Sequence, residues 1–366
     1  MGAFLWRGDP LADRVADAFA ELPPGAGMAL LDRGLERGAA SVADGPEPLR
    51  ELLTEIEKVP AWVDAEALRR GGELLFRAGW FGGLVLGISL LYGYASPGGN
   101  KPLVFSGRLA EQAPRRLRET SRFVEATCSQ NGLARGGAGR AITVKVRLMH
   151  AHVRKMLLRS GRWDEEAWGL PINQHDMAGT SVLFSLAPIE SLRALGYEFD
   201  AKEVHLYMQL WRYSGHLMGV DPELLPTSEH DARRLTDIVT ATEGPPDEDS
   251  RKLAKALFTS GPRSIQGTPK ERARALRLAD IGEGLLRSVM GEVLADGLGV
   301  PRTRYRHAIH PVRSVVARLE QNILLRRGLR DRSIEVGRRY WQAAVARERE
   351  PMLFSLPDEL LGTSRA

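Results

Sequence analysis

The residues best suited to chemistry lie in the segment RLMHAHVR, residues 147–154, which we expect to be helical. With 3.6 residues per turn, His150 falls on an apolar stripe, and Arg147 and Arg154 lie about one turn to either side of it. A neutral imidazole flanked by two guanidiniums suits an axial ligand of haem iron whose propionates pair with the arginines. A buried histidine with a hydrogen-bond partner on a basic helix fits the same spacing, so the spacing alone leaves both interpretations open.

The composition predicts a soluble globular protein. The chain has 366 residues, of which 43% are hydrophobic and 27% are charged, and it contains one cysteine, Cys128. A single cysteine excludes an internal disulfide framework and any cysteine-based zinc or iron–sulfur site. The first residues lack the pattern of a secretory signal, so we expect a cytoplasmic protein. The net charge of +5 is spread widely, which argues against nucleic acid as a partner.

Several common catalytic motifs are absent from the sequence. There is no HExxH zinc motif, no G-x-S-x-G nucleophile elbow, no phosphate-binding G-x-x-x-x-G-K-S/T and no Glu-x-x-His pair for a di-iron bundle. The familiar hydrolase, nucleotide-binding and di-iron functions are therefore not supported.

The elements that must position these residues are helices, because apolar residues recur at helical spacing and runs of period-two alternation are nearly absent. Residues 108–130 predict a helix on which Arg116 and Thr120 share a face. Residues 78–100 carry no charge and predict a buried core helix, with membrane association as the alternative. Residues 244–250, GPPDEDS, predict an exposed linker. The fold class is therefore all-α.

The order of short motifs along residues 50–330 resembles the oxygenase family of latex clearing proteins and the fungal membrane-bound oxygenase of mycophenolic acid biosynthesis. The motifs are, in order, Arg116 and Thr120; Arg147, His150, Ala151, Val153 and Arg154; Pro171 to Gln174 with Asp176 and Thr180; Trp211-Arg212 with Gly215, Gly219 and Val220; and Leu225-Pro226.

The resemblance implies a globin-like helical bundle that encloses one haem b, with His150 as the ligand of its iron. It also implies oxidation or cleavage of a hydrophobic substrate, an isoprenoid, an unsaturated lipid-like molecule or a polymer, by O₂. The expected division is an N-terminal helical extension at 1–50, the haem-binding oxygenase-like domain at 51–330, and a C-terminal helix and tail at 331–366. Peripheral membrane association is compatible with such a substrate.

The same resemblance places Arg116, Glu119 and Thr120 as candidate catalytic residues in the distal pocket. Thr120 would donate a hydrogen bond to bound oxygen, and Arg116 would stabilise negative charge on it. The alternatives are a hydrogen bond from Thr120 to its own helix and exposure of Arg116 to solvent. Glu119 is either a distal acid or base, or a solvated partner of a neighbouring arginine.

This sequence departs from the family at two positions. Glu119 occupies the place of the family's distal lysine, and residues 98–101 contain no counterpart of its upstream carboxylate. A non-catalytic haem-binding or lipid-binding protein on the same scaffold is therefore the alternative function.

Overall fold

The computed structural model describes residues 1–105, 109–260 and 267–346, and within these ranges it contains helices and no strand, which confirms the all-α prediction. The N-terminal half comprises the 3₁₀ helices η1 (Gly2–Trp6) and η2 (Ala39–Val42) and the helices α1 (Pro10–Ala20), α2 (Ala26–Arg37), α3 (Glu47–Glu57), α4 (Ala65–Arg70), α5 (Glu73–Arg77), α6 (Trp80–Tyr94), α7 (Pro97–Phe105), α8 (Leu109–Cys128), α9 (Ala138–Arg159) and α10 (Glu165–Trp168).

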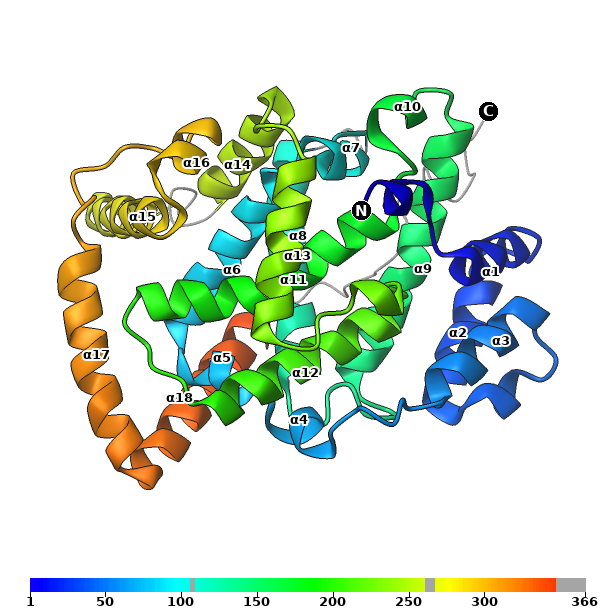
Figure 1. Ribbon diagram of the computed structural model, residues 1–366, viewed down its shortest axis with the longest axis horizontal. Coiled ribbons are helices and arrows are strands. Elements are labelled where there is room, and N and C mark those ends of the chain that lie inside the picture. Colours follow the sequence, from blue (N-terminus) through cyan, green and yellow to red (C-terminus); the bar gives the residue numbers. More distant parts are fainter. Residues whose placement is uncertain (106–108, 261–266, 347–366) are drawn as a thin grey trace.

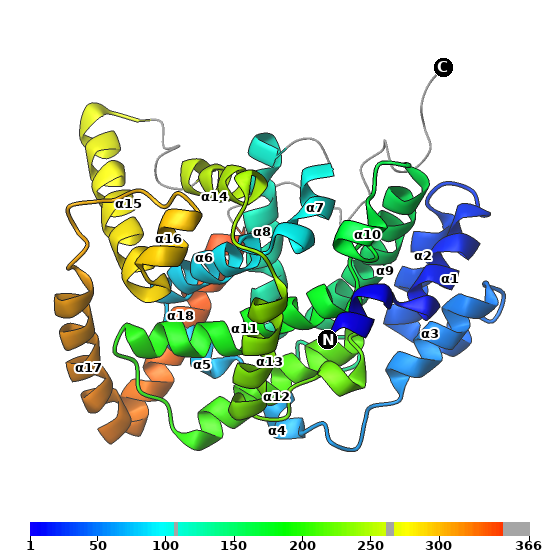
Figure 2. The ribbon, with the colours of Figure 1, turned by 45° about the horizontal axis from the view of Figure 1, so that its top comes forward.

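The C-terminal half continues with α11 (Gln174–Ala194), α12 (Ala201–Leu217), η3 (Pro222–Leu224), α13 (Glu229–Thr242), α14 (Glu248–Ser260), α15 (Pro269–Met290), α16 (Glu292–Gly297), α17 (Ile309–Leu325) and α18 (Arg327–Ala346). Helices α6, α8, α9, α11 and α12 form the centre of the molecule (Figure 1). Both ribbon views place α1, α2 and α3 beside α9 on one side and α15 and α17 on the other (Figures 1 and 2).

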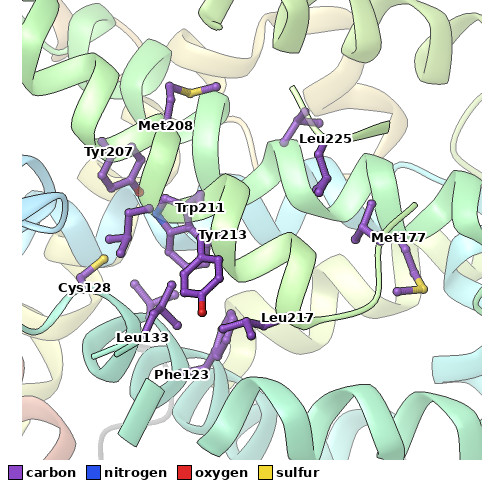
Figure 3. Close-up of a cluster of buried hydrophobic side chains, with 14 of the residues drawn as sticks. Phe123, Cys128, Leu133, Met177, Tyr207, Met208, Trp211, Tyr213, Leu217 and Leu225 are labelled. Carbon is purple, nitrogen blue, oxygen red and sulfur yellow. The ribbon is translucent and has the colours of Figure 1, made fainter. Parts of the chain in front are cut away.

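One large hydrophobic core holds most of these helices together. It extends from Leu11 in α1 to Trp341 in α18, and at its centre the aromatic rings of α12 pack against Phe123 of α8 (Figure 3). A second, smaller core lies between α6, α14, α15 and α16. Residues 1–50 and α18 thus share a core with the segment between them. The division of the chain at residues 50 and 330 stays a prediction about sequence segments.

The apolar segment 78–100 contains a buried helix, as the sequence predicts, but that helix is shorter than the segment. Helix α6 ends at Tyr94, and α7 begins at Pro97 because the proline lacks the backbone N–H that would continue α6. Among the described residues, no single helix is long and apolar enough to span a membrane; one bent pair, Ala65–Arg77 with Trp80–Tyr94 at 97°, meets the length and composition requirement.

The prediction of an exposed linker at 244–250 is wrong for its second half. Helix α14 begins at Glu248, and the carboxylates of Asp247 and Asp249 bind the ammonium of Lys101 on α7 at 2.9 Å and 2.7 Å. The buried hydroxyl of Ser250 accepts a hydrogen bond from Asn100. Although the composition of residues 244–250 is typical of linkers, the segment includes the start of α14, which contacts α7.

Candidate functional site

Helix α9 positions the predicted iron ligand. Its buried residues Val144, Leu148 and Ala151 pack into the main core, which fixes the rotation of the helix about its axis. His150 is half-buried on this helix, and Arg154, one turn further on, is 2% exposed. The structure therefore places the two side chains on adjoining turns of a rigid element.

His150 has a buried ring nitrogen, Nδ1, with no hydrogen-bond partner. Burial, and secondarily the charge of Arg154, lower the pKa of His150 from 6.5 to about 4, although Asp9 opposes the shift. The imidazole is therefore neutral at pH 7 and keeps a free lone pair. If His150 bound iron through Nε2, a carbonyl or carboxylate would be expected to hold its Nδ1; the structure provides no such partner, so that expectation is wrong.

The surroundings of the Arg154 guanidinium suit an anion-binding site. Its Nε contacts Asp13 at 3.2 Å, its Nη1 donates to the carbonyl of Ile172 at 3.0 Å, and its buried Nη2 has no partner. Ile172 has a φ of 51°, a conformation that β-branched residues rarely adopt. Such strain is typical of functional sites, and here it directs a carbonyl toward the guanidinium.

Arg147 uses its donors within the protein. Its Nε and Nη2 bind Asp9 at 2.6 Å and 3.1 Å, and its Nη1 binds Glu55 at 3.1 Å. Because each of its three nitrogens faces a carboxylate, Arg147 serves in this structure to attach α1 and α3 to α9. Its predicted pairing with a haem propionate gains no support from these contacts and stays a prediction.

The three candidate catalytic residues lie on α8, which packs along α9. Thr120 Oγ1 donates to the carbonyl of Arg116 at 2.8 Å, and Glu119 binds Arg115 at 2.8 Å with about a fifth of its side chain exposed. Arg116 reaches toward the carbonyl of Leu103, and burial lowers its pKa. These contacts match the non-catalytic alternatives for Thr120 and Glu119, and the catalytic roles stay predictions.

The polar run at the start of α11 is mainly structural. Asn173 caps the helix by accepting from the Asp176 N–H at 2.9 Å, and Thr180 is exposed. Gln174 donates to the carbonyls of Gly8 and Gly219, both at 2.9 Å, and accepts from the Asp221 N–H at 2.7 Å. This amide therefore joins three distant segments next to Arg147 and Arg154.

Sequence reasoning missed Asp9 and Asp13, the carboxylates that bind the two arginines of α9. A signal was present, because Asp9, Asp13 and Asp17 follow one another at four-residue spacing. Asp17 continues the series by binding Lys155 at 2.6 Å. Nothing local, however, indicates that α1 lies against a helix that begins more than a hundred residues later.

The donor set next to His150 fits a haem. A neutral imidazole with a free lone pair is the form that binds iron, and a buried guanidinium nitrogen without a partner suits a propionate. A small apolar cavity of about 10 Å³ lies elsewhere in the core, between α5, α6, α11 and α12, and it is not lined by His150. That cavity has room for no more than about one water molecule and is not a cofactor site.

An all-α fold built around these central helices is also found in a solved structure. The structure of latex clearing protein in the closed state matches with a TM-score of 0.71, covering 95% of this chain and 93% of that one at 19% sequence identity. At this identity the likeness shows the shared fold.

Residues 69–320 match the family described as "ER-bound oxygenase mpaB/B'/Rubber oxygenase, catalytic domain". The match covers more than half of the chain, and the protein therefore belongs to this oxygenase family. A curated relative, the rubber oxygenase of Streptomyces sp. (strain K30), is 26% identical over 230 residues. That alignment covers 62% of this chain and 56% of the relative, so the chain spans little more than half the length of that protein.

Proposed function

We propose that this protein is a haem b-dependent oxygenase that oxidises or cleaves a hydrophobic isoprenoid or unsaturated lipid-like substrate with O₂. The observation that carries the proposal is the neutral, half-buried imidazole of His150 one turn from the unpartnered guanidinium nitrogen of Arg154. Membership of an oxygenase family that includes rubber oxygenase supports both the reaction type and an apolar substrate.

In this proposal His150 holds the iron, and Arg154 binds a propionate through its free Nη2. When bound, the haem supplies the redox chemistry with O₂. Low polarity around the ring keeps His150 unprotonated, so no proton competes with the metal for the lone pair. Arg116 on the adjacent α8 holds a positive charge in partly buried surroundings, where it would stabilise a developing negative charge more strongly than in water.

The first test is the absorption spectrum of the purified, haem-reconstituted protein. The wild type is expected to show a Soret band, and His150→Ala is expected to lose it. His152→Ala is the matched control, because His152 lies on the same helix and its Nδ1 contacts the carbonyl of Leu148 at 2.8 Å. A full Soret band in His150→Ala would remove the ligand assignment.

The second test measures O₂ consumption with isoprenoid oligomers and unsaturated lipids. Cleavage of one carbon–carbon double bond by one O₂ yields two carbonyl groups, with both oxygen atoms in the products and no external reductant. We expect two carbonyls per O₂ consumed. A Soret band without O₂ consumption would instead support a non-catalytic haem-binding protein, which is the alternative that the contacts of Thr120 and Glu119 favour.

A further inference from the structure

A second group of potential ligands lies at the N-terminus of α11, away from His150 on α9. His175 and Asp176 occupy the first turn of α11, and Glu243 directly follows α13. One ligand atom from each residue lies within 4.8 Å of the other two. An imidazole nitrogen and two carboxylate oxygens from separate segments thus converge on one point.

Hydrogen bonding favours one protonation pattern of His175. The hydroxyl of Thr242 lies 2.8 Å from the carbonyl of Val239 in its own helix and 2.7 Å from His175 Nε2. A hydroxyl has one proton, and donation of that proton to the helix carbonyl leaves its oxygen to accept from Nε2–H. The lone pair of Nδ1 then points at Asp176 Oδ1, 3.0 Å away. Two acceptors at this distance are held together by either a proton or a metal ion.

The carboxylates are held in place by neighbouring polar groups. Asp176 Oδ2 accepts from Asn173 Nδ2 at 3.1 Å, which leaves Oδ1 facing His175. Ser96 lies close enough to Glu243 to lower the pKa of its carboxyl. Burial raises the pKa of Glu243, and the charge of Asp176 raises it further. Carboxylates that lie close together and are oriented by neighbouring polar groups are typical of metal ligands.

We propose that His175 Nδ1, Asp176 and Glu243 bind a divalent transition-metal ion of the Zn²⁺ type. A donor set of one imidazole and two carboxylates suits Zn²⁺ and its neighbours, whereas Mg²⁺ and Ca²⁺ prefer oxygen ligands alone. Nε2–H of His175, bonded to Thr242, fixes the ring so that Nδ1 faces the ion. Thr242 is exposed, which gives an ion a path from solvent.

The test is equilibrium dialysis of the full-length protein against Zn²⁺ after treatment with EDTA, with zinc measured by elemental analysis. We expect one zinc per chain. Glu243→Gln preserves the shape of the side chain and removes one charged ligand. It is expected to weaken zinc binding at least about 100-fold, which exceeds the usual effect of losing a residue that only hydrogen-bonds to a metal ligand. The matched controls are Glu223→Gln and His205→Gln, two exposed positions whose substitution is expected to leave zinc binding unchanged.

Cobalt provides a second measurement that does not depend on activity or haem. Co²⁺ bound by imidazole and carboxylates absorbs in the visible range, and its d–d spectrum is expected in the wild type and lost in Glu243→Gln, with folding checked by circular dichroism. Absence of stoichiometric zinc from the folded wild type, equal binding in Glu243→Gln, or full competition by equimolar Mg²⁺ would each overturn the proposal. The result is independent of the oxygenase assignment, because only zinc and cobalt are measured.

Discussion

His150 differs from the other histidines of α9 and α12 in what surrounds its ring. His152 contacts a backbone carbonyl and His216 packs against Trp62 and Tyr213, whereas the buried Nδ1 of His150 has no partner. An unpaired polar atom in partly buried surroundings costs stability, on the order of 1–3 kcal/mol. The neutral ring can still bind a metal through its other nitrogen, Nε2, and the ligand role of this residue stays a proposal.

The lowered pKa of His150 predicts how the stability of the haem-free protein depends on pH. The unfolded chain takes up a proton near pH 6.5 and the folded chain only near pH 4, so the free energy of unfolding falls as the pH drops through this window. His150→Phe lacks this titration and is expected to lose less stability between pH 7 and 4.5. Urea denaturation at both pH values measures the difference, and parallel losses in the two proteins would contradict the lowered pKa.

The sequence predicts which residues share a helix more readily than it predicts the partners of their side chains. The spacing around His150 correctly indicates one helix with a histidine and an arginine on adjoining turns. It also indicates two equivalent arginines, yet Arg147 binds Asp9 and Glu55 while Arg154 keeps one nitrogen without a partner. The difference arises from contacts with residues 92 and 138 positions away, which helical periodicity does not encode.

At the scale of elements, α1 is attached to α9 by a series of carboxylates that differ in burial. The side chains of Asp9 and Arg147 are each about 5% exposed, whereas that of Asp17 is half exposed where it binds Lys155. A buried charge that loses its partner costs far more than an exposed one. The attachment of α1 therefore depends mainly on its first residue pair.

Asp9→Asn tests this dependence. Asparagine still caps α1 at the Ala12 N–H but removes the charge that Arg147 needs, so we expect a loss of about 3–5 kcal/mol in the free energy of unfolding. Asp17→Asn, further along the same face of α1 and half exposed, is expected to cost less than about 1 kcal/mol. Chemical denaturation compares the two, and equal losses would argue against the buried pair as the main attachment.

Helix positions and caps were largely predictable, since they depend on local chemistry. Asp64 caps α4 by accepting from the Glu66 N–H at 2.7 Å, and aspartate is among the residue types preferred at this position. Breaks between helices are harder to predict from local chemistry, and α4 and α5 are separated by Gly71 and Gly72. A Cβ at Gly72 would lie 1.9 Å from the carbonyl oxygen of Cys128, a close approach between segments that the sequence does not show.

At the scale of the whole molecule, the C-terminal helices belong to the main core. Arg77 on α5 forms buried ion pairs with Glu203 on α12 and Glu320 on α17, and Arg330 on α18 also binds Glu203. Trp341 on α18 is 2% exposed and packs near Gly82 of α6. The family match ends at residue 320, but the core does not.

Two adjacent aromatic residues of α18 test this arrangement. Trp341→Ala is expected to lower the free energy of unfolding by about 3–5 kcal/mol, because it empties a buried site in the main core. Tyr340→Ala, whose side chain is 46% exposed, is expected to cost less than about 1 kcal/mol. Denaturant unfolding followed by tryptophan fluorescence and circular dichroism measures both variants. Similar small losses would mean that α18 is detachable.

The three segments that Gln174 joins have a consequence for the order in which the chain matures during synthesis. Residues 7 and 8 leave the ribosome before Gln174, and the hydrogen bonds of this amide are complete only when residues 219 and 221 have also emerged. Until then, residues 7 and 8 lack these hydrogen bonds, although Asp9 already has its partner Arg147 once α9 has been made. The turn that precedes α1 thus completes its hydrogen bonding only after α9, α11 and α12 have all been made, although α1 itself can pack on α9 earlier.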